Sequence, residues 1–400
     1  MSKKTPCPDC GPAPTNHLFE KLSVCIRYGI APVVPPLHFI EKKLGVLFSY
    51  PVSKRAAHTL LYALTKIGAA TAVAAPTIAT PDRTRVLFES AEKCGIKMQE
   101  FHLFGKKSLC CVATKNDKII FFETLPRPPH AETHALLWMD DKSVMRKKFA
   151  EAGIPIARGG YATRIPTALD LFHSLAKPVI IKPSLGSRSR HTTIHIQDER
   201  DFLLAFKKAK QLSPRAVIEE QLEGFVFRAT VIGGKSVAVL RRDPAFVVGD
   251  GIHTIRALAE LENKNPRRRG GHFHLLPIDE TAEQELARQN LSWASIPAAG
   301  KYIPLGQKAS RGEGIGGGTT DVTRETHPDN VAVFEKVAAT LRDPLVGIDF
   351  IIADISKSWR DQPRSGVIEC NSMPFIDLHH DPLYGEPIDA AGALWDIVFT

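Results

Sequence analysis

Apolar and polar residues alternate in two short segments near the end of the chain, at residues 347–353 and 365–370. Side chains of a strand point alternately to opposite faces, so this pattern predicts two strands joined by a polar loop. Glu369 and Asn371 lie two residues apart in the second segment and therefore share a face. Asp349 can face them from the first strand, which would bring two carboxylates and an amide oxygen together.

Similar periodicities predict most of the other elements. Alternating patterns predict strands at Lys97–Leu103, Leu109–Thr114, Lys118–Glu123, Lys177–Ile181, Thr192–Ile196, Ala216–Glu220, Phe225–Ile232 and Ser236–Arg242. Helical spacing predicts helices at Ser53–Ile67, Val86–Cys94, Asp201–Leu212, Ile255–Asn263, Glu280–Gln289 and Asn330–Leu341. A further helix is predicted to begin after Asp140 or Asp141, which caps it, and to end near Gly153. Turn-forming residues close hairpins at Asn116-Asp117 and Gly233-Gly234. Residues 17–50 have a mixed pattern and predict no element.

The first 130 residues show no chemistry that we can assign, and we expect them to pack against the rest and form one wall of a site. Cys7 and Cys10 form a C-x-x-C pair. A zinc ribbon needs a second pair of ligands at similar spacing, and the remaining cysteines do not supply one. We therefore interpret residues 1–15 as a flexible, proline-rich arm rather than a metal site.

The composition is that of a soluble globular protein of two or three packed units, with 400 residues, 44% hydrophobic and 24% charged. Seven cysteines, an odd number, and the lack of a secretory segment indicate free thiols and a cytoplasmic location. The apolar run from Ile67 to Ala79 contains Pro76 and is too short to span a bilayer, so we expect no membrane segment.

The net charge of +9 raises the question of a nucleic-acid partner. The basic residues are scattered and no aromatic residues alternate with them, so we expect no such partner. The most basic turn, Arg267 to Arg269, is interpreted as a solvated surface, with nucleic-acid contact as the alternative.

Two groups of residues suggest chemistry. Asp349, Glu369 and Asn371 offer the hard oxygen ligands that suit Mg²⁺, although an acid at a strand end can also be a simple turn or cap. The segment from Lys182 to Arg190 is a small, basic loop between two predicted strands. Such a loop can cover phosphates with backbone N–H groups and cations, and the alternative is an ordinary surface hairpin.

Three longer stretches resemble the ATP-grasp superfamily, and within it the ATP-grasp modules of cyanophycin synthetases and bifunctional glutathione synthetases. They are VVGDGIHTI at 247–255, the spacing from DVTRETHPDN to GIDFIIADIS, and VIECNSMPF at 367–375. The resemblance runs from about Asp141 to Thr400. It implies an α+β (α/β) fold in which two α+β subdomains clasp ATP, preceded by an N-terminal α/β region.

On this basis we divide the chain into four parts. These are an arm at 1–15, an N-terminal region at 16–137, the ATP-grasp N-terminal helix and lid subdomain at 138–222, and the catalytic subdomain at 223–400. Related modules often self-associate, so a homo-oligomer is one quaternary state that we expect. The chain ends at Thr400, which leads us to expect no second ligase module after the first.

The resemblance also implies roles for individual residues. Asp349, Glu369 and Asn371 would bind Mg²⁺, with Mn²⁺ as an alternative. Lys142 and Lys182 would reach the ATP phosphates, and Glu219 would bind adenine at the hinge. Arg228 would lie near the transferred phosphate and the acyl group. No nucleophilic side chain is needed for ligation through an acyl phosphate, so Cys370 is interpreted as a packing residue, with a thiol nucleophile as the alternative.

The sequence departs from the family pattern at three places. Val226 stands where an acid usually holds the ribose, so either Glu223 or Glu220 would substitute for it or the ribose would be held less well. Ser189 and His191 replace glycine in the phosphate loop, and Arg188 and Arg190 would then act by charge.

The third departure is the stretch from Gly312 to Gly317, which keeps the paired glycines Gly316 and Gly317 near the substrate but lacks the usual polar groups. We therefore expect a substrate different from those of the named enzymes.

Together these features predict an ATP-dependent ligase that joins a carboxylate to an amine, with an amino acid or peptide among its small-molecule substrates, and that releases ADP and phosphate. The alternative is a catalytically weakened ATP-binding or scaffold protein of the same fold, suggested by Val226 and by the altered loop at Ser187 to His191.

Overall fold

A computed structural model describes residues 7, 10, 16–30, 59–77, 80–128, 138–185, 190–268, 273–307 and 316–400. The helices are α1 (His17–Ile30), α4 (Asp82–Lys93), α5 (Lys142–Glu151), α6 (Ile165–Ser174), α7 (Glu199–Ala209), α8 (Ile255–Glu262), α9 (Glu280–Arg288), α10 (Pro328–Leu341), α11 (Asp377–His380) and α12 (Ala390–Phe399). Residues 59–66 are also helical.

The strands are β1 (Ala70–Val73), β2 (Lys97–Leu103), β3 (Lys106–Lys115), β4 (Lys118–Glu123), β5 (Gly159–Ala162), β6 (Val179–Pro183), β7 (Thr193–Ile196), β8 (Ala216–Glu220), β9 (Phe225–Ile232), β10 (Lys235–Asp243), β11 (Phe246–Val248), β12 (Tyr302–Pro304), β13 (Gly318–Asp321), β14 (Leu345–Ile352) and β15 (Gly366–Asn371).

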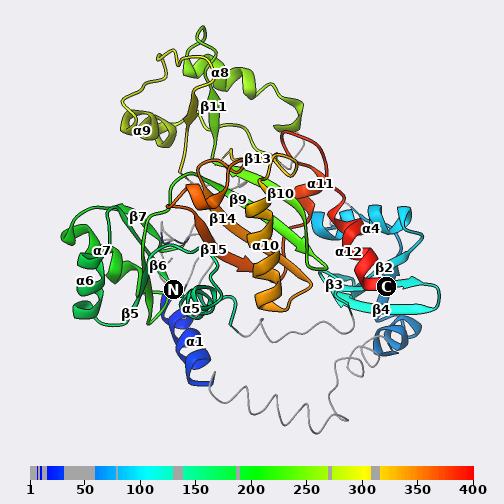
Figure 1. Ribbon diagram of the computed structural model, residues 1–400. Coiled ribbons are helices and arrows are strands. Elements are labelled where there is room, and N and C mark those ends of the chain that lie inside the picture. Colours follow the sequence, from blue (N-terminus) through cyan, green and yellow to red (C-terminus); the bar gives the residue numbers. More distant parts are fainter. Residues whose placement is uncertain are drawn as a thin grey trace, which may run out of the picture.

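A five-stranded sheet lies at the centre of the molecule, in the order β13-β10-β9-β14-β15. Helix α10 covers one of its faces (Figure 1). Every second residue of β9 and β14 points toward this helix and into a common apolar core, which includes Phe227, Ala229, Ile348 and Phe350. The residues between them, such as Arg228, lie on the opposite face. The alternation along the sequence therefore separates a packing face from a face that is available for chemistry.

A four-stranded sheet in the order β5-β8-β6-β7 forms a second layer, covered by α6 and α7. Its core contains three phenylalanines, Phe172, Phe202 and Phe206, together with aliphatic residues of the strands. Strands β6 and β7 are antiparallel, and the predicted basic loop from Lys182 to Arg190 joins them.

The first part of the chain packs with the last. Strands β1 to β4 form a sheet in sequence order, and α4 and α12 lie beside each other next to this sheet (Figure 1). One core holds Leu87 of α4 and Trp395 of α12, together with Ile232 and Leu345 from the central sheet. The indole N–H of Trp395 donates to the carbonyl oxygen of Leu87 at 3.1 Å. Helix α4 and strands β2 to β4 thus share a hydrophobic core with the central sheet.

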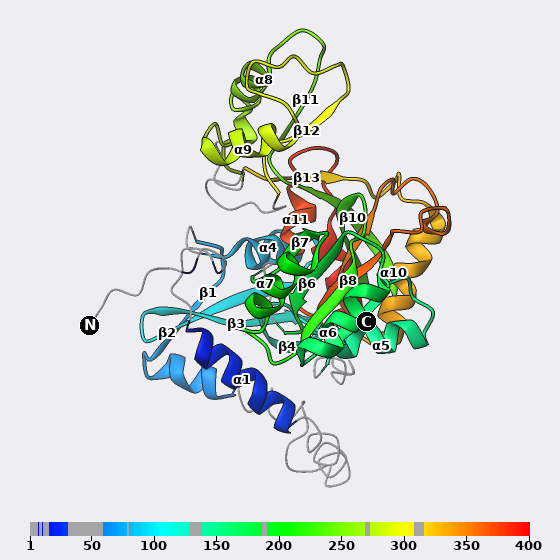
Figure 2. The same cartoon turned by 90° about the vertical axis from the view of Figure 1, so that its left-hand side faces the viewer.

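Helices α8 and α9 and the short sheet of β11 and β12 form a lobe that projects from the body of the molecule (Figure 2). The lobe has its own core, which includes Ile255, Leu286 and Ile303. Arg268 connects this lobe to the body, because it pairs with Glu262 at 2.7 Å and donates to the backbone oxygen of Gly316 at 3.0 Å.

The structure confirms most of the predicted elements, with shifts of a few residues at their ends, and it corrects several interpretations. Residues 17–30 form α1 although no element was predicted there. Strand β5 and helices α6 and α12 were also missed. The interpretation of Arg267 to Arg269 as a solvated surface is wrong for Arg268, which is buried, while Arg269 lies outside the described residues. Within the described chain, we find no helix whose length and hydropathy would let it span a bilayer.

Two residues of the predicted flexible arm at 1–15 contact a distant part of the chain. The thiols of Cys7 and Cys10 both lie within hydrogen-bonding distance of His191, which precedes β7. No local pattern predicts this contact, because His191 is far from both cysteines along the chain.

Candidate active site

Arg228 and Asp349 form a buried ion pair on the face of the central sheet opposite α10. They are paired residues in the ladder between β9 and β14. Arg228 Nε lies 2.5 Å from Asp349 Oδ1, and the guanidinium makes a second hydrogen bond of 2.9 Å to Oδ2. Burial alone would raise the pKa of Asp349, but Arg228, with help from Arg242 at 3.7 Å, lowers it below its usual value. Asp349 is therefore an ionised carboxylate at neutral pH.

A β-bulge places Glu369 and Asn371 beside this pair. Asp349 is opposite Glu369 in the ladder between β14 and β15, whereas the next residue, Phe350, is opposite Val367. The extra residue on β15 lets both Val367 and Cys370 enter the core while Glu369 and Asn371 remain on the face of Asp349. The predicted placement of Asp349, Glu369 and Asn371 on one face is thus present in the fold.

Cys370 packs in the core, as predicted. Burial raises the pKa of its thiol well above the usual value, and the charges of Asp349 and Glu369 act in the same direction. A neutral, enclosed thiol is a poor nucleophile, which agrees with a packing role.

Lys142 is the first residue of α5. Asp141 caps this helix by accepting a hydrogen bond of 2.9 Å from the backbone N–H of Ser143. The backbone N–H of Lys142 donates to the backbone oxygen of Ser184, the residue after β6, at 2.9 Å, which holds the start of α5 against the four-stranded sheet of β5 to β8. Burial lowers the pKa of Lys142, while the negative charge of Glu369 opposes that effect.

Lys182 and Glu219 face each other on neighbouring strands, β6 and β8. Lys182 Nζ lies 2.6 Å from a carboxylate oxygen of Glu219, and Arg146 donates to the other carboxylate oxygen. Burial raises the pKa of Glu219, but these two cations together bring it below its usual value. The sequence reading missed Arg146, although it lies four residues after Lys142 and therefore on the same helix face.

A cavity of about 430 Å³ opens beside Lys142 at the start of α5 and beside Glu369 and Asn371 of β15. Its lining comes from α1, from α5 and the residues before it, from the segments that follow β6 and α7, and from β15. It consists of Glu20, Ser23, Val24, Met139, Asp140, Lys142, Met145, Leu185, Arg190, Leu212, Glu369 and Asn371. Four predicted site residues, Lys142, Arg190, Glu369 and Asn371, thus share one cavity. Helix α1 supplies part of its wall, as expected for the N-terminal region.

No model of a known protein family matches the chain. It is similar to cyanophycin synthetase of Trichormus variabilis, with 33% identity over 267 residues, 65% of this chain and 29% of that protein. It is also similar to a bifunctional glutathione biosynthesis protein of Listeria innocua, with 29% identity over 324 residues, 79% of this chain and 41% of that protein.

The structure is similar to the crystal structure of a bifunctional glutathione synthetase from Pasteurella multocida, with a TM-score of 0.60 and 24% identity, over 79% of this chain and 43% of that one. The chain has the ATP-grasp fold. The predicted fold class and the predicted resemblance are confirmed. The chain spans less than half the length of each of these relatives.

Several other predicted residues are not among those that line the cavity. Glu223, a candidate for holding ribose, is exposed and pairs with Arg364 at 3.3 Å. Glu220, the other candidate, accepts a hydrogen bond of 3.0 Å from the backbone N–H of Ala176. Gly316 and Gly317 are buried at the base of the projecting lobe. Residues 186–189 and 308–315 lie outside the described residues, so Ser187, Arg188, Ser189 and the stretch from Gly312 to Ile315 are not placed.

His379 was not singled out in the sequence, yet it lies beside the ion pair of Arg228. Its Nε2 is 2.7 Å from the hydroxyl of Thr230, which shares a strand face with Arg228. Burial lowers the pKa of His379 to about 3, and the charge of Arg228 contributes to this shift. The ring is therefore neutral at physiological pH.

The oxygen donors on β14 and β15 fit a hard divalent cation. Asp349 accepts two hydrogen bonds from Arg228, but a carboxylate has further lone pairs for a metal. Among the described residues, no group provides a hydrogen-bond partner for the buried side-chain nitrogen of Asn371. An amide whose nitrogen is not anchored can present its oxygen toward Glu369. Two carboxylates and an amide oxygen are the donors that Mg²⁺ prefers.

Proposed function

We propose that this ATP-grasp chain is an ATP-dependent ligase that forms an amide bond between a carboxylate and an amine through an acyl phosphate, releasing ADP and phosphate. The observation that carries the proposal is the single cavity onto which Lys142, Glu369 and Asn371 open beside the pair of Arg228 and Asp349. The similarity to cyanophycin and glutathione synthetases supports an amino acid or peptide among the substrates.

The chemistry requires charge neutralisation and positioning rather than a nucleophilic side chain. A free carboxylate is a poor acylating agent, and phosphorylation gives it a good leaving group. Lys142 and Lys182 would hold the ATP phosphates, and Arg228 would stabilise the charge that develops on the transferred phosphoryl group. Lys182 is held in place by Glu219, which limits the reorganisation needed when ATP binds.

The cation belongs on the opposite face of the central sheet from α10. Asp349, Glu369 and Asn371 would hold Mg²⁺, or Mn²⁺ as the alternative. When bound, the ion would offset negative charge on the phosphates.

We place the enzyme in the cytoplasm. We expect small-molecule substrates and neither a membrane nor a nucleic-acid partner. The quaternary state to be tested is a homo-oligomer, and light scattering coupled to size-exclusion chromatography measures it directly.

The test is ADP release on incubation with ATP, Mg²⁺ and a panel of amino acids and short peptides. We expect acceptor-dependent ADP release that falls at least about 10²-fold in Glu369→Gln, because one hard ligand is lost. Glu89→Gln, which alters an exposed acid on α4, is the matched control and should match the wild type. ATP binding without ADP release for any substrate would contradict the proposal.

The alternative is a weakened ATP-binding or scaffold protein, and the loss of the ribose acid at Val226 favours it. Calorimetric titration with ATP and Mg²⁺ distinguishes the two. A ligase should bind ATP in the micromolar to millimolar range and lose that affinity in Lys142→Met. A weakened ATP-binding or scaffold protein should bind ATP weakly or not at all and should tolerate Glu369→Gln in its biological role.

A further inference from the structure

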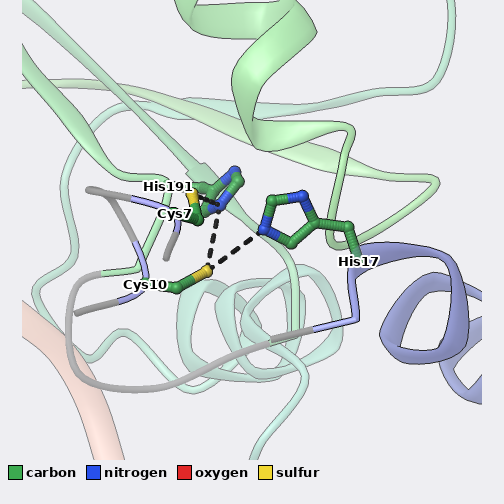
Figure 3. A group of neighbouring side chains, drawn as sticks. All are labelled: Cys7, Cys10, His17 and His191. Carbon is green, nitrogen blue, oxygen red and sulfur yellow. Dashed lines mark hydrogen bonds between the residues drawn. The ribbon is translucent and has the colours of Figure 1, made fainter. Parts of the chain in front are cut away.

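Four side chains that the proposed ligase reaction does not use converge next to the sheet of β5 to β8. Cys7 and Cys10 precede α1, His17 begins it, and His191 precedes β7 (Figure 3). One ligand atom of each residue lies within 4.8 Å of the ligand atoms of the others. Two cysteines and two histidines are a common donor set for structural zinc.

The distances approach those of a tetrahedral site. Cys10 Sγ lies 3.3 Å from His17 Nε2 and 3.3 Å from His191 Nε2, and Cys7 Sγ lies 3.6 Å from His191 Nε2. Tetrahedral zinc with ordinary bond lengths would separate a sulfur ligand from a nitrogen ligand by ~3.6 Å. The four atoms therefore need only small movements to enclose one ion.

The rest of the structure orients the ligands. His191 Nδ1 is 2.8 Å from the backbone oxygen of Lys208, so this nitrogen carries the proton and Nε2 is left for a metal. His191 is also buried, which fixes its ring. The backbone N–H of Cys10 donates to the carbonyl of Cys7 at 3.0 Å. This hydrogen bond closes a tight turn, and such a turn can direct both thiols of a C-x-x-C pair to one point.

We propose that Cys7, Cys10, His17 and His191 bind a structural zinc ion. Two thiolates would neutralise its charge, and four protein ligands leave no open position for chemistry. The sequence did not reveal the site because one histidine lies beside the cysteine pair whereas the other is 181 residues beyond Cys10.

The ion would hold α1 in the position where it forms part of the cavity wall. Beyond the four ligands, three further contacts join α1 to residues beside the sheet of β5 to β8. Glu20 pairs with Arg190 at 3.3 Å, the hydroxyl of Tyr28 lies 2.5 Å from that of Ser184, and the guanidinium of Arg215 lies 4.1 Å from the centre of the Tyr28 ring. Zinc would therefore hold the cavity wall formed by Glu20, Ser23 and Val24 against the phosphate loop that His191 follows. The binding of zinc itself does not depend on the proposed ligase activity.

Metal analysis of the full-length protein, purified under reducing conditions and dialysed against metal-free buffer, tests the site. We expect about one zinc ion per chain in the wild type and on the order of a tenth of that in Cys7→Ser and Cys10→Ser. The control variant is Cys25→Ser, which changes an exposed cysteine of α1, and this variant should bind as much zinc as the wild type. A wild type with no more zinc than Cys10→Ser, or a Cys10→Ser variant that retains zinc, would overturn the proposal.

Cobalt substitution gives a readout that does not depend on how the variants fold. Replacing zinc with Co²⁺ in the wild type should give the strong visible absorption of a tetrahedral site and thiolate-to-metal charge transfer. Weak absorption of octahedral type would contradict the assigned ligands. Hydrogen exchange of residues 17–30 should accelerate when a chelator removes the zinc and slow again when zinc is restored. Unchanged exchange would refute the fastening of α1.

Discussion

Arg228 and Asp349 bind each other so closely that neither can be removed without a large effect on folding. In Arg228→Met we expect a loss of about 3–5 kcal/mol of unfolding free energy, because Asp349 is left buried without its main partner. Lys357→Ala is the control, since it removes an exposed partner of Asp354 and should cost less than about 1 kcal/mol. Urea denaturation measures both, and equal midpoints for the two variants would contradict a structural role for the buried pair.

His379 links stability to pH. Its pKa is about 3 in the folded chain, below the usual 6.5, so the unfolded chain binds one more proton between these values. Stability therefore falls as the pH drops below 6.5, and the slope for this residue approaches about 1.4 kcal/mol per pH unit.

Comparing His379→Gln with the wild type isolates this effect, because all other histidines are common to both proteins. Thermal or urea unfolding between pH 7 and pH 4.5 should show a weaker pH dependence in His379→Gln. Parallel curves for the two proteins would mean that His379 is accessible to protons in the folded state.

At the level of elements, Gly224 controls the approach of β9 to the end of β14. Its φ is +115°, and a Cβ atom here would overlap the backbone carbonyl of Ile352. Gly234, in the turn between β9 and β10, has a φ of +81° but no described atom within 4 Å of such a Cβ. Gly234→Ala should cost roughly 1–2 kcal/mol from its backbone conformation alone.

Gly224→Ala should cost about 1–3 kcal/mol more than Gly234→Ala, because β9 must also move away from β14. Urea denaturation of both variants measures this difference. If both lose the same stability, the close approach at Ile352 is not maintained in solution.

Local patterns predicted the elements that form the site. Strand β9 has the predicted bounds, Asp141 caps α5 as expected, and alternation correctly placed Glu369 and Asn371 on one face. The bulge in β15 could not be predicted, because it depends on which residues enter the core beside β14. Helix α1 was missed because its apolar residues are largely exposed and its contacts lie far away in the sequence.

At the scale of the molecule, sequence reasoning identified the fold from three stretches but not the long-range contacts between the layers. Arg146 reaches Glu219, and His191 reaches Cys10, across separations that no local pattern encodes. These residues are specified by the packing of the layers, so they appear only once the chain is folded. The four predicted segments, with boundaries after residues 15, 137 and 222, remain a prediction.

The shared core of the first and last parts of the chain gives those boundaries a direct test. A fragment of residues 138–400 keeps the ATP-grasp layers but exposes Trp395, Ile232 and Leu345, which pack against Leu87 and its neighbours in the full chain. Losing this burial should make the fragment less stable and prone to association, because a large apolar surface meets water. Size-exclusion chromatography, urea denaturation and tryptophan fluorescence of the fragment and the full chain measure the effect. A monomeric fragment with the full chain's unfolding midpoint would show that residues 138–400 fold as an independent unit and that the N-terminal region only covers them.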